Sequence, residues 1–222
     1  MEKELYTSEI TEEFLNLYND LDDLIGDGQY SAFVKFYDDR INNLRRIRNL
    51  AVHASYQGKR PFLVSIYVLN DLKDLLRRAK TKCIDVAIKK ENIKYLKLTD
   101  PISKAVKYII EDGFSCLPIV DNGFRVIGAV TSKGLVSIMH EKEGSFMYDN
   151  SITIGSEIDN FSIVNNPRES FIFKAKQDLF EYTRKEVENL KTHFSGCFIT
   201  EHGSRNEALE GLFTMWDVRH YL

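Results

Sequence analysis

Two copies of a short Gly-x-x-Thr motif hold the polar residues whose spacing is most informative about chemistry. Gly128 precedes Thr131 by three residues, and Gly211 precedes Thr214 in the same way. In the second copy, Asp217 follows three residues after Thr214. A threonine between a strand and a helix can offer its hydroxyl and the first helical N–H groups to a phosphate. An aspartate one turn later can accept both hydroxyls of a ribose, so the second copy indicates a nucleotide site.

The first copy departs from this pattern because Gly134 stands where the second has its aspartate. We therefore expect the first site either to lack its ribose acceptor or to be empty. Trp216 lies inside the second motif, next to the residues of the expected site. We interpret it as a packing residue, with contact to a purine as the alternative.

The motifs belong to longer segments that repeat one order of elements. Residues 117–139 and 197–222 each predict an apolar strand, a turn, a second strand and the start of a helix. Residues 101–110 and 171–190, which precede them, have apolar residues at helical spacing. The predicted unit is strand, helix, strand, strand, helix, used twice. Since neither copy can bury its apolar strands alone, the two should pair.

This pattern resembles the CBS-domain pair, the regulatory Bateman module, over Lys82 to Leu222. The resemblance implies two units, residues 81–143 and 144–222, whose clefts bind AMP, ADP, ATP or a related adenosyl compound. It also implies that the site of Thr214 and Asp217 is completed by the backbone of Gly196 and Cys197. The other expected contributors are residues 90–95 with Tyr95, while Thr131 serves the first site.

The first 80 residues predict only helices, so the whole chain is expected to be an α+β protein with a helical bundle at residues 1–80. One helix should run from Ser8 to Ile25 and stop at Gly26. Ser31 is expected to cap a second helix that ends near Ala54. After a loop, Pro61 suits the first turn of a third helix.

The end of the second predicted helix holds a second group of residues with possible chemistry, the string from Arg48 to His53. It resembles the motif of HEPN domains, with the likeness extending over residues 11–80. The resemblance implies a metal-independent ribonuclease, in which His53 moves the proton of an RNA 2′-hydroxyl and Arg48 stabilises the charged phosphorus centre.

Helix geometry sets a condition on this hypothesis. Five residues correspond to about 140° of rotation, so Arg48 and His53 do not share a face, whereas Asn49 and His53 nearly do. One chain alone therefore makes a poor catalytic pair, and the HEPN resemblance implies a dimer that brings two copies of the motif into one cleft. The alternative is that Arg48 pairs with Asp38, Asp39 or helix-end carbonyls, and that His53 caps the helix C-terminus.

Three functions remain open from the sequence. The first is a regulatory protein that senses an adenine nucleotide and changes the state of a helical dimerisation domain. The second is a ligand-gated ribonuclease with RNA as its partner, and the third is a non-catalytic interaction module with vestigial clefts. A homodimer is expected in each case.

Composition and charge indicate the class of protein and the compartment in which it works. The net charge is −3, and 43% apolar residues can fill compact cores. Three cysteines without CxxC spacing favour a reducing compartment. With neither an apolar signal segment nor a long apolar run, we expect a cytoplasmic protein without a membrane partner. The five histidines lack the spacing of metal ligands, so no metal is expected.

Overall fold

The computed structural model describes residues 5–53, 62–142, 145–147, 149, 151–164 and 166–219. The chain forms two compact units, Met1–Thr81 and Lys82–Leu222, called here the helical unit and the repeat unit. The predictions for the helix end at Ala54, for the loop at 55–60 and for Pro61 lie outside the described residues.

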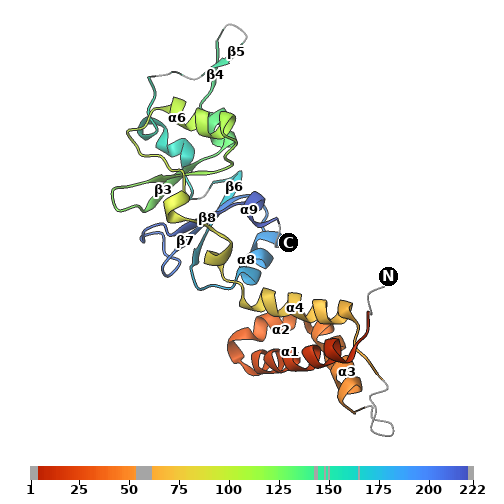
Figure 1. Ribbon diagram of the computed structural model, residues 1–222. Helices are drawn as coiled ribbons and strands as arrows, with labels where there is room; N and C mark the ends of the chain where they lie inside the picture. The colour runs from red at the N-terminus through yellow and green to blue at the C-terminus, as the bar shows by residue number, and fades with distance from the viewer. Residues whose placement is uncertain are drawn as a thin grey trace. The chain divides into compact units, whose positions relative to one another are not determined.

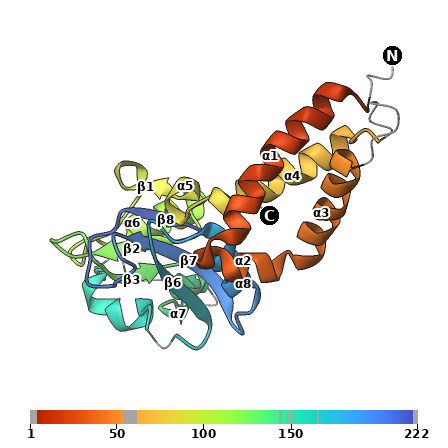
Figure 2. The same cartoon turned by 90° about the horizontal axis from the view of Figure 1, so that it is seen from below.

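The described helices of the helical unit form a small bundle (Figures 1 and 2). They are α1 (Ser8–Gly26), a 3₁₀ turn (Gly28–Tyr30), α2 (Ser31–Phe36), α3 (Asp38–His53) and α4 (Ile66–Lys80). The Thr7 hydroxyl accepts a hydrogen bond from the Ile10 amide at 3.1 Å and so caps α1. Phe14, Tyr18 and Leu21 form its buried stripe. The first helix therefore follows its prediction within one residue.

The other helices of this unit correct two predictions. The single helix expected from Ser31 is interrupted at Tyr37, whose amide donates to the carbonyls of both Phe33 and Val34 at 3.2 Å. The third helix begins at Ile66 and is capped by Ser65, whose hydroxyl accepts from the Val68 amide. Residues 62–64 are not helical, because a serine with extended backbone directly before the apolar run satisfies the first helical amides.

The first half of the repeat unit begins with α5 (Cys83–Val86), which precedes the first strand, and a 3₁₀ turn (Lys90–Asn92) follows that strand. Its main elements are β1 (Ile88–Lys89), α6 (Ile102–Val106) continued by a π-helical turn (Lys107–Glu111), β2 (Leu117–Val120), β3 (Val126–Val130) and α7 (Ser132–Ser137). We call β1 to α7 the first repeat. The strand, helix, strand, strand, helix order is the predicted one.

The second repeat follows two short strands, β4 (His140–Lys142) and β5 (Ser145–Met147), and a 3₁₀ helix (Gly155–Phe161). It consists of β6 (Glu169–Ala175), α8 (Phe180–Glu188), β7 (His193–Thr200), β8 (Gly211–Phe213) and α9 (Met215–Val218). The helix predicted over residues 171–190 was wrong in its first part. Phe171 and Phe173 point to one side of β6 and both pack on the ring of Phe198, at centroid distances of 6.0 and 5.2 Å.

The main sheet exchanges a strand between the repeats. Its order is β1-β8-β7-β6, so β1 of the first repeat pairs with β8 of the second, with Ile88 opposite Leu212. The β2 and β3 strands form a separate hairpin. Residues of both repeats, including Cys116 and Phe198, share one apolar cluster. A cavity at the β1 and β8 edge is therefore built from both repeats.

The glycines of the two motifs allow close packing at this junction. A Cβ on Gly211 would lie 2.9 Å from the Cβ of Ala87, and one on Gly128 would lie 2.9 Å from the carbonyl oxygen of Phe161. Each glycine thus lets another segment of the chain approach its strand, which explains why this residue type stands at that place in both copies.

Candidate functional site

The second motif lines a cavity of about 200 Å³, called here the Asp217 cavity. Three segments form its walls: residues 88–94, residues 113–116 and the motif at 212–217. The first two belong to the first repeat and the third to the second. The exchange of β1 brings them together, because Ile88 and Leu212 face each other across the pair of strands. Any ligand held here contacts both repeats.

Asp217 has one carboxylate oxygen engaged and one available. Its Oδ2 accepts hydrogen bonds from the Thr214 amide at 2.7 Å and from the Thr214 hydroxyl at 2.8 Å. These contacts cap α9 and explain the three-residue spacing of the motif. Within the described residues, Oδ1 has no hydrogen-bond partner. A carboxylate oxygen in this state can accept a hydroxyl hydrogen bond from a ligand.

The remaining walls of the Asp217 cavity combine apolar, aromatic and cationic groups. Ile93 and Leu212 are buried, with exposures of 6% and 4%, and form an apolar surface. Trp216 is 69% exposed at the wall, so its interpretation as a packing residue was wrong. An exposed indole can stack on a base. Lys94 lines the cavity and has no ion-pair partner in the described part of the chain.

Of the expected segment 90–95, residues 92–94 line the Asp217 cavity, whereas the other ligand-binding residues predicted from the sequence lie elsewhere. Gly196 and Cys197 are inside β7, and the Asp217 cavity has neither in its described lining. A Cβ on Gly196 would lie 3.2 Å from the Sγ of Cys116, because residues 113–116 cover this part of β7. Tyr95 lines a neighbouring cavity, and Thr131 lines a third one. Of the six predicted residues, the structure brings only Thr214 and Asp217 together here.

Thr131 lines a second cavity of about 200 Å³, called here the Thr131 cavity, in which its hydroxyl meets a carboxylate. The hydroxyl accepts from the Gly134 amide at 3.1 Å and donates to Oε2 of Glu169 at 2.9 Å. The Ser195 hydroxyl donates to Oε1 of Glu169 at 2.7 Å. All three side chains are buried. Glu169 comes from β6, so this acid is supplied by the opposite repeat.

Sequence reasoning missed Glu169, although it noticed that Gly134 cannot supply an acid. A Cβ on Gly134 would lie 3.2 Å from a ring carbon of Phe161, so an aspartate at this position would displace a buried ring. The hydrogen bond to Thr131 depends on how β6 sits beside α7. No local spacing in the sequence marks it.

The two cavities lie next to each other. Both are lined by Ser115, Thr214 and Trp216. Burial raises the pKa of the Cys116 thiol, and the carboxylates of Glu169 and Asp217 raise it further. The two acids therefore act on the same buried atom. This arrangement gives the repeat unit two acid-bearing sites around a common centre.

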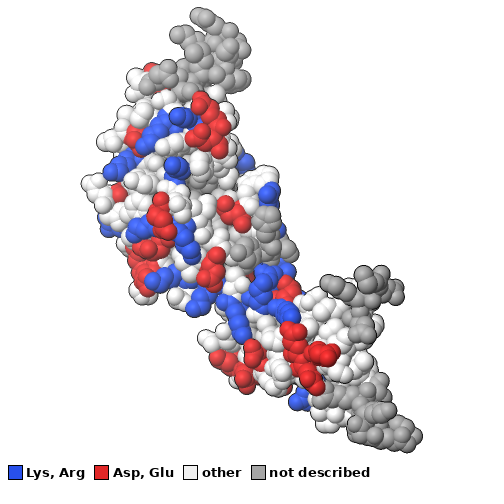
Figure 3. Space-filling view, viewed as in Figure 1, with Lys and Arg blue, Asp and Glu red and all other residues white. Residues whose placement is uncertain are grey.

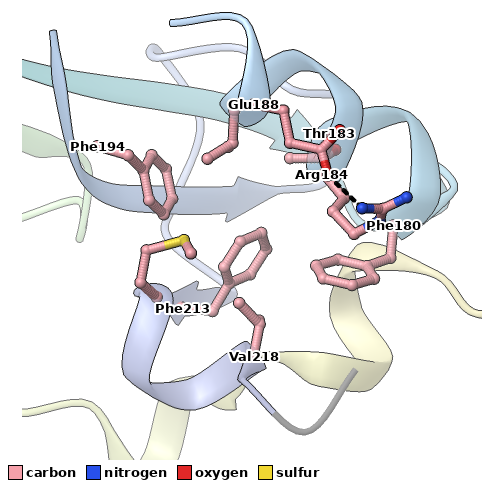
Figure 4. Close-up of a pocket in the computed structure, with 9 residues that line it drawn as sticks. Phe180, Thr183, Arg184, Glu188, Phe194, Phe213 and Val218 are labelled. Carbon is pink, nitrogen blue, oxygen red and sulfur yellow. Dashed lines mark hydrogen bonds and ion pairs between the residues drawn. The ribbon is translucent and has the colours of Figure 1, made fainter. Parts of the chain in front are cut away.

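A smaller cavity of about 40 Å³ lies within the second repeat (Figure 4). The rings of Phe180, Phe194 and Phe213 surround it, and Arg184 pairs with Glu188 at its edge. Its volume holds one or two water molecules at most. We interpret it as a gap in the core and not as a nucleotide site.

In the helical unit, the structure does not join Arg48 to His53. Arg48 donates to Oδ1 of Asn49 at 3.2 Å, and its guanidinium lies 5.9 Å from the ring centroid of Tyr18. Burial raises the pKa of Tyr18, while the nearby Arg45 and Arg48 oppose this shift. His53 is exposed at the end of α3. Arg48 thus has an internal aromatic contact instead of the predicted partners Asp38 or Asp39.

Charge on the surface is mixed. Figure 3 shows Lys and Arg side chains interspersed with Asp and Glu side chains on the face in view. Across the described residues, no group of three or more His, Cys, Asp or Glu side chains is placed to hold a metal ion. No helix in that part of the chain is long and apolar enough to cross a membrane.

Comparison with known proteins finds a family match for part of the repeat unit. Residues 85–141 match the family model described as the CBS domain. No curated protein matches the chain. Among solved structures, it is similar to a hemolysin-like protein containing a CBS domain from Oenococcus oeni PSU, at 15% identity over 68% of this chain and 96% of that chain, with a TM-score of 0.47.

Two further solved structures have similar values. The CBS domain of a bacterial CNNM/CorC family Mg²⁺ transporter is 16% identical over 81% of this chain and 93% of that chain, with a TM-score of 0.48. CBSX2 in complex with AMP is 14% identical over 63% of this chain and 94% of that chain, with a TM-score of 0.46.

Proposed function

We propose that the repeat unit is a regulatory module that binds an adenine nucleotide in the Asp217 cavity. The observation that carries the proposal is the free Oδ1 of Asp217 inside a cavity whose walls come from both repeats. In this assignment Asp217 and Thr214 hold the ribose, and Trp216 stacks on the base. Lys94 balances the phosphate charge. Residues 113–116 form the part of the cavity wall that we had expected from the backbone of Gly196 and Cys197.

The walls of the cavity suggest how binding regulates the chain. Residues 88–94 and 212–217 belong to different repeats, so a ligand between them favours the arrangement in which both sets of contacts form. The helical unit is the element whose state would respond, and we propose that it dimerises. The nucleotide then acts as an effector, with a coupling free energy between its site and the helical dimer. The proposed setting is the cytoplasm, where such ligands are abundant.

We propose the Thr131 cavity as a second, weaker site. The carboxylate of Glu169 stands beside the Thr131 hydroxyl, as that of Asp217 stands beside Thr214. Both oxygens of Glu169 already accept hydrogen bonds from hydroxyls, whereas Asp217 keeps one oxygen free. A ligand in the Thr131 cavity must therefore share or displace an internal hydrogen bond, which lowers its affinity.

A ribonuclease function for the helical unit remains the second candidate. One observation favours it: Asn49 and His53 are both exposed and lie four residues apart on α3. A second chain could bring its own Arg48 to this face. Under this candidate, nucleotide binding to the repeat unit opens or closes a site for single-stranded RNA.

Thermal unfolding of the whole chain with separate nucleotides tests the main proposal. AMP, ADP, ATP and S-adenosylmethionine should be compared with guanosine and cytidine nucleotides at equal concentrations. A ligand that binds only the folded chain raises its apparent stability, by about 2.7 kcal/mol at a hundredfold excess over Kd. We expect stabilisation by at least one adenosine compound. Identical thermal unfolding curves with and without every ligand, together with no heat of binding in calorimetry, would contradict the proposed function.

A further inference from the structure

The Asp217 cavity opens beside a larger cavity of about 460 Å³ that is rich in lysine. This lysine cavity is lined by Ile93, Lys94, Tyr95, Lys97, Asp100, Lys104 and Tyr108. Ile93 and Lys94 also line the Asp217 cavity. The two cavities therefore share a wall, and a ligand in one can extend along that wall into the other.

The charges of the lysine cavity are unbalanced. Its one carboxylate, Asp100, pairs with Lys104 at 2.8 Å and also accepts from the Lys97 amide at 2.8 Å. Within the described residues, the ammonium groups of Lys94 and Lys97 form no ion pair, and Lys97 interacts with the charge of Asp100 only at longer range. In contrast, Lys90 nearby is paired with Glu210 at 2.9 Å. Two lysines thus remain available for an anion that enters the cavity.

Aromatic contacts hold the walls of the lysine cavity in place. The ring of Tyr95 meets Phe124 edge-on at a centroid distance of 5.1 Å, and Tyr108 meets Phe114 edge-on at 6.2 Å. Phe114 itself lines the Asp217 cavity. The tyrosines on one side and the shared Ile93 and Lys94 on the other therefore fix the two cavities relative to each other.

We infer that the ligand of the Asp217 cavity carries a chain of phosphates, and that this chain lies in the lysine cavity. The inference rests on the proposed nucleotide site and names its ligand class: a nucleoside di- or triphosphate, selected over a monophosphate. Lys94 stands where the two cavities meet and contacts the phosphate nearest the ribose. Lys97 and Lys104 contact the terminal phosphates, where each added negative charge gains a cationic neighbour.

Calorimetry on the full chain with AMP and ATP separates this inference from the proposed function. We expect ATP to bind at least about tenfold more tightly than AMP, because Lys97, which forms no ion pair, and Lys104 face its additional charges. Lys97→Ala should weaken the binding of ATP by about fivefold and leave the affinity for AMP unchanged within error. Lys107→Ala is the matched control, since Lys107 is exposed next to the same segment and does not line the cavity.

Salt provides a second measurement. The affinity for ATP should fall more steeply with ionic strength than that for AMP, and Lys97→Ala should reduce the difference. Equal affinities for AMP and ATP, or an ATP affinity unaffected by Lys97→Ala, would overturn the inference while the nucleotide site stands. If neither AMP nor ATP binds, the inference and the proposed function both fail.

Discussion

The hydroxyl of Thr131 donates a 2.9 Å hydrogen bond to the carboxylate of Glu169, a residue of the opposite repeat. In the second motif, Thr214 makes the same contact with Asp217 of its own repeat, at 2.8 Å. Each motif threonine therefore meets a carboxylate, although only one motif encodes it locally. The bond from Thr131 ties the start of α7 to the start of β6 and so links the two repeats.

This link predicts a coupled loss of stability. Glu169→Ala leaves the buried hydroxyls of Thr131 and Ser195 without their acceptor, which should cost about 1 to 3 kcal/mol. Thr131→Val removes one of those hydroxyls, so its effect should be smaller in the Glu169→Ala background than in the wild type. Urea unfolding, followed by the fluorescence of Trp216 as the sole tryptophan, measures this cycle.

The control for this cycle is Glu111→Ala, which changes an exposed glutamate outside the Thr131 cavity. Strictly additive effects of Glu169→Ala and Thr131→Val would contradict a structural bond between the repeats.

The helical unit should lose stability in acid because of Asp74. Burial disfavours its charge, but hydrogen bonds from Arg78, Arg77 and Arg40 outweigh this and hold its pKa well below its usual range. Since the folded pKa is depressed, the stabilisation is complete above the unfolded pKa and is lost as pH falls between about 5 and 2. Allowing for solvent screening, we expect a contribution on the order of 1 kcal/mol.

Asp74→Asn checks this directly. The variant should be less stable than wild type at neutral pH, and the difference should shrink as pH falls, as measured by denaturant unfolding with circular dichroism. A difference that stays constant down to acid pH would show that the charge of Asp74 contributes nothing.

Assembly is the third prediction. Several large apolar side chains of the repeat unit are exposed: Ile110 and Val136 are each 66% exposed. Surfaces of this kind are often covered in an oligomer, and a homodimer also serves the proposed regulation. Light scattering at micromolar concentration should give twice the chain mass of 25.7 kDa. A mass near that of one chain would exclude the dimer.

The ribonuclease candidate predicts cleavage of single-stranded RNA without added metal. Arg48→Ala and His53→Ala should each abolish it, because an imidazole transfers the proton and a guanidinium binds the phosphate. Arg46→Ala, a change to an exposed arginine on the same helix, serves as the control. Intact RNA with every adenine nucleotide, or cleavage by His53→Ala at the wild-type rate, would leave Arg48 with the structural contact to Tyr18 alone.

The sequence predicted what depends on local spacing. The extent of α1 follows from its apolar stripe, and the three-residue spacing of Thr214 and Asp217 correctly placed both at one cavity, although their hydrogen bond to each other was not predicted. The sequence did not predict contacts that depend on how strands far apart in the chain pack together. The bond between Thr131 and Glu169 requires β6 to lie beside α7, and residues 113–116 reach the Asp217 cavity only because of how the repeats pack.

One further error shows the same limit within a single segment. Residues 171–175 have apolar residues compatible with a helix, yet they form β6 because Phe171 and Phe173 pack on Phe198 of the neighbouring strand. Tertiary contacts thus overrode the helical spacing on which the prediction rested.

The most direct test of the proposed site is calorimetry of Asp217→Asn with an adenine nucleotide. Asparagine keeps one oxygen to accept from the Thr214 amide, so α9 stays capped, but the charged acceptor for the ribose is lost. Removing a hydrogen bond to a charged group costs about 1.5 to 3 kcal/mol. The account predicts at least roughly tenfold weaker binding, with Glu201→Gln unchanged. Equal affinity of wild type and Asp217→Asn would contradict it.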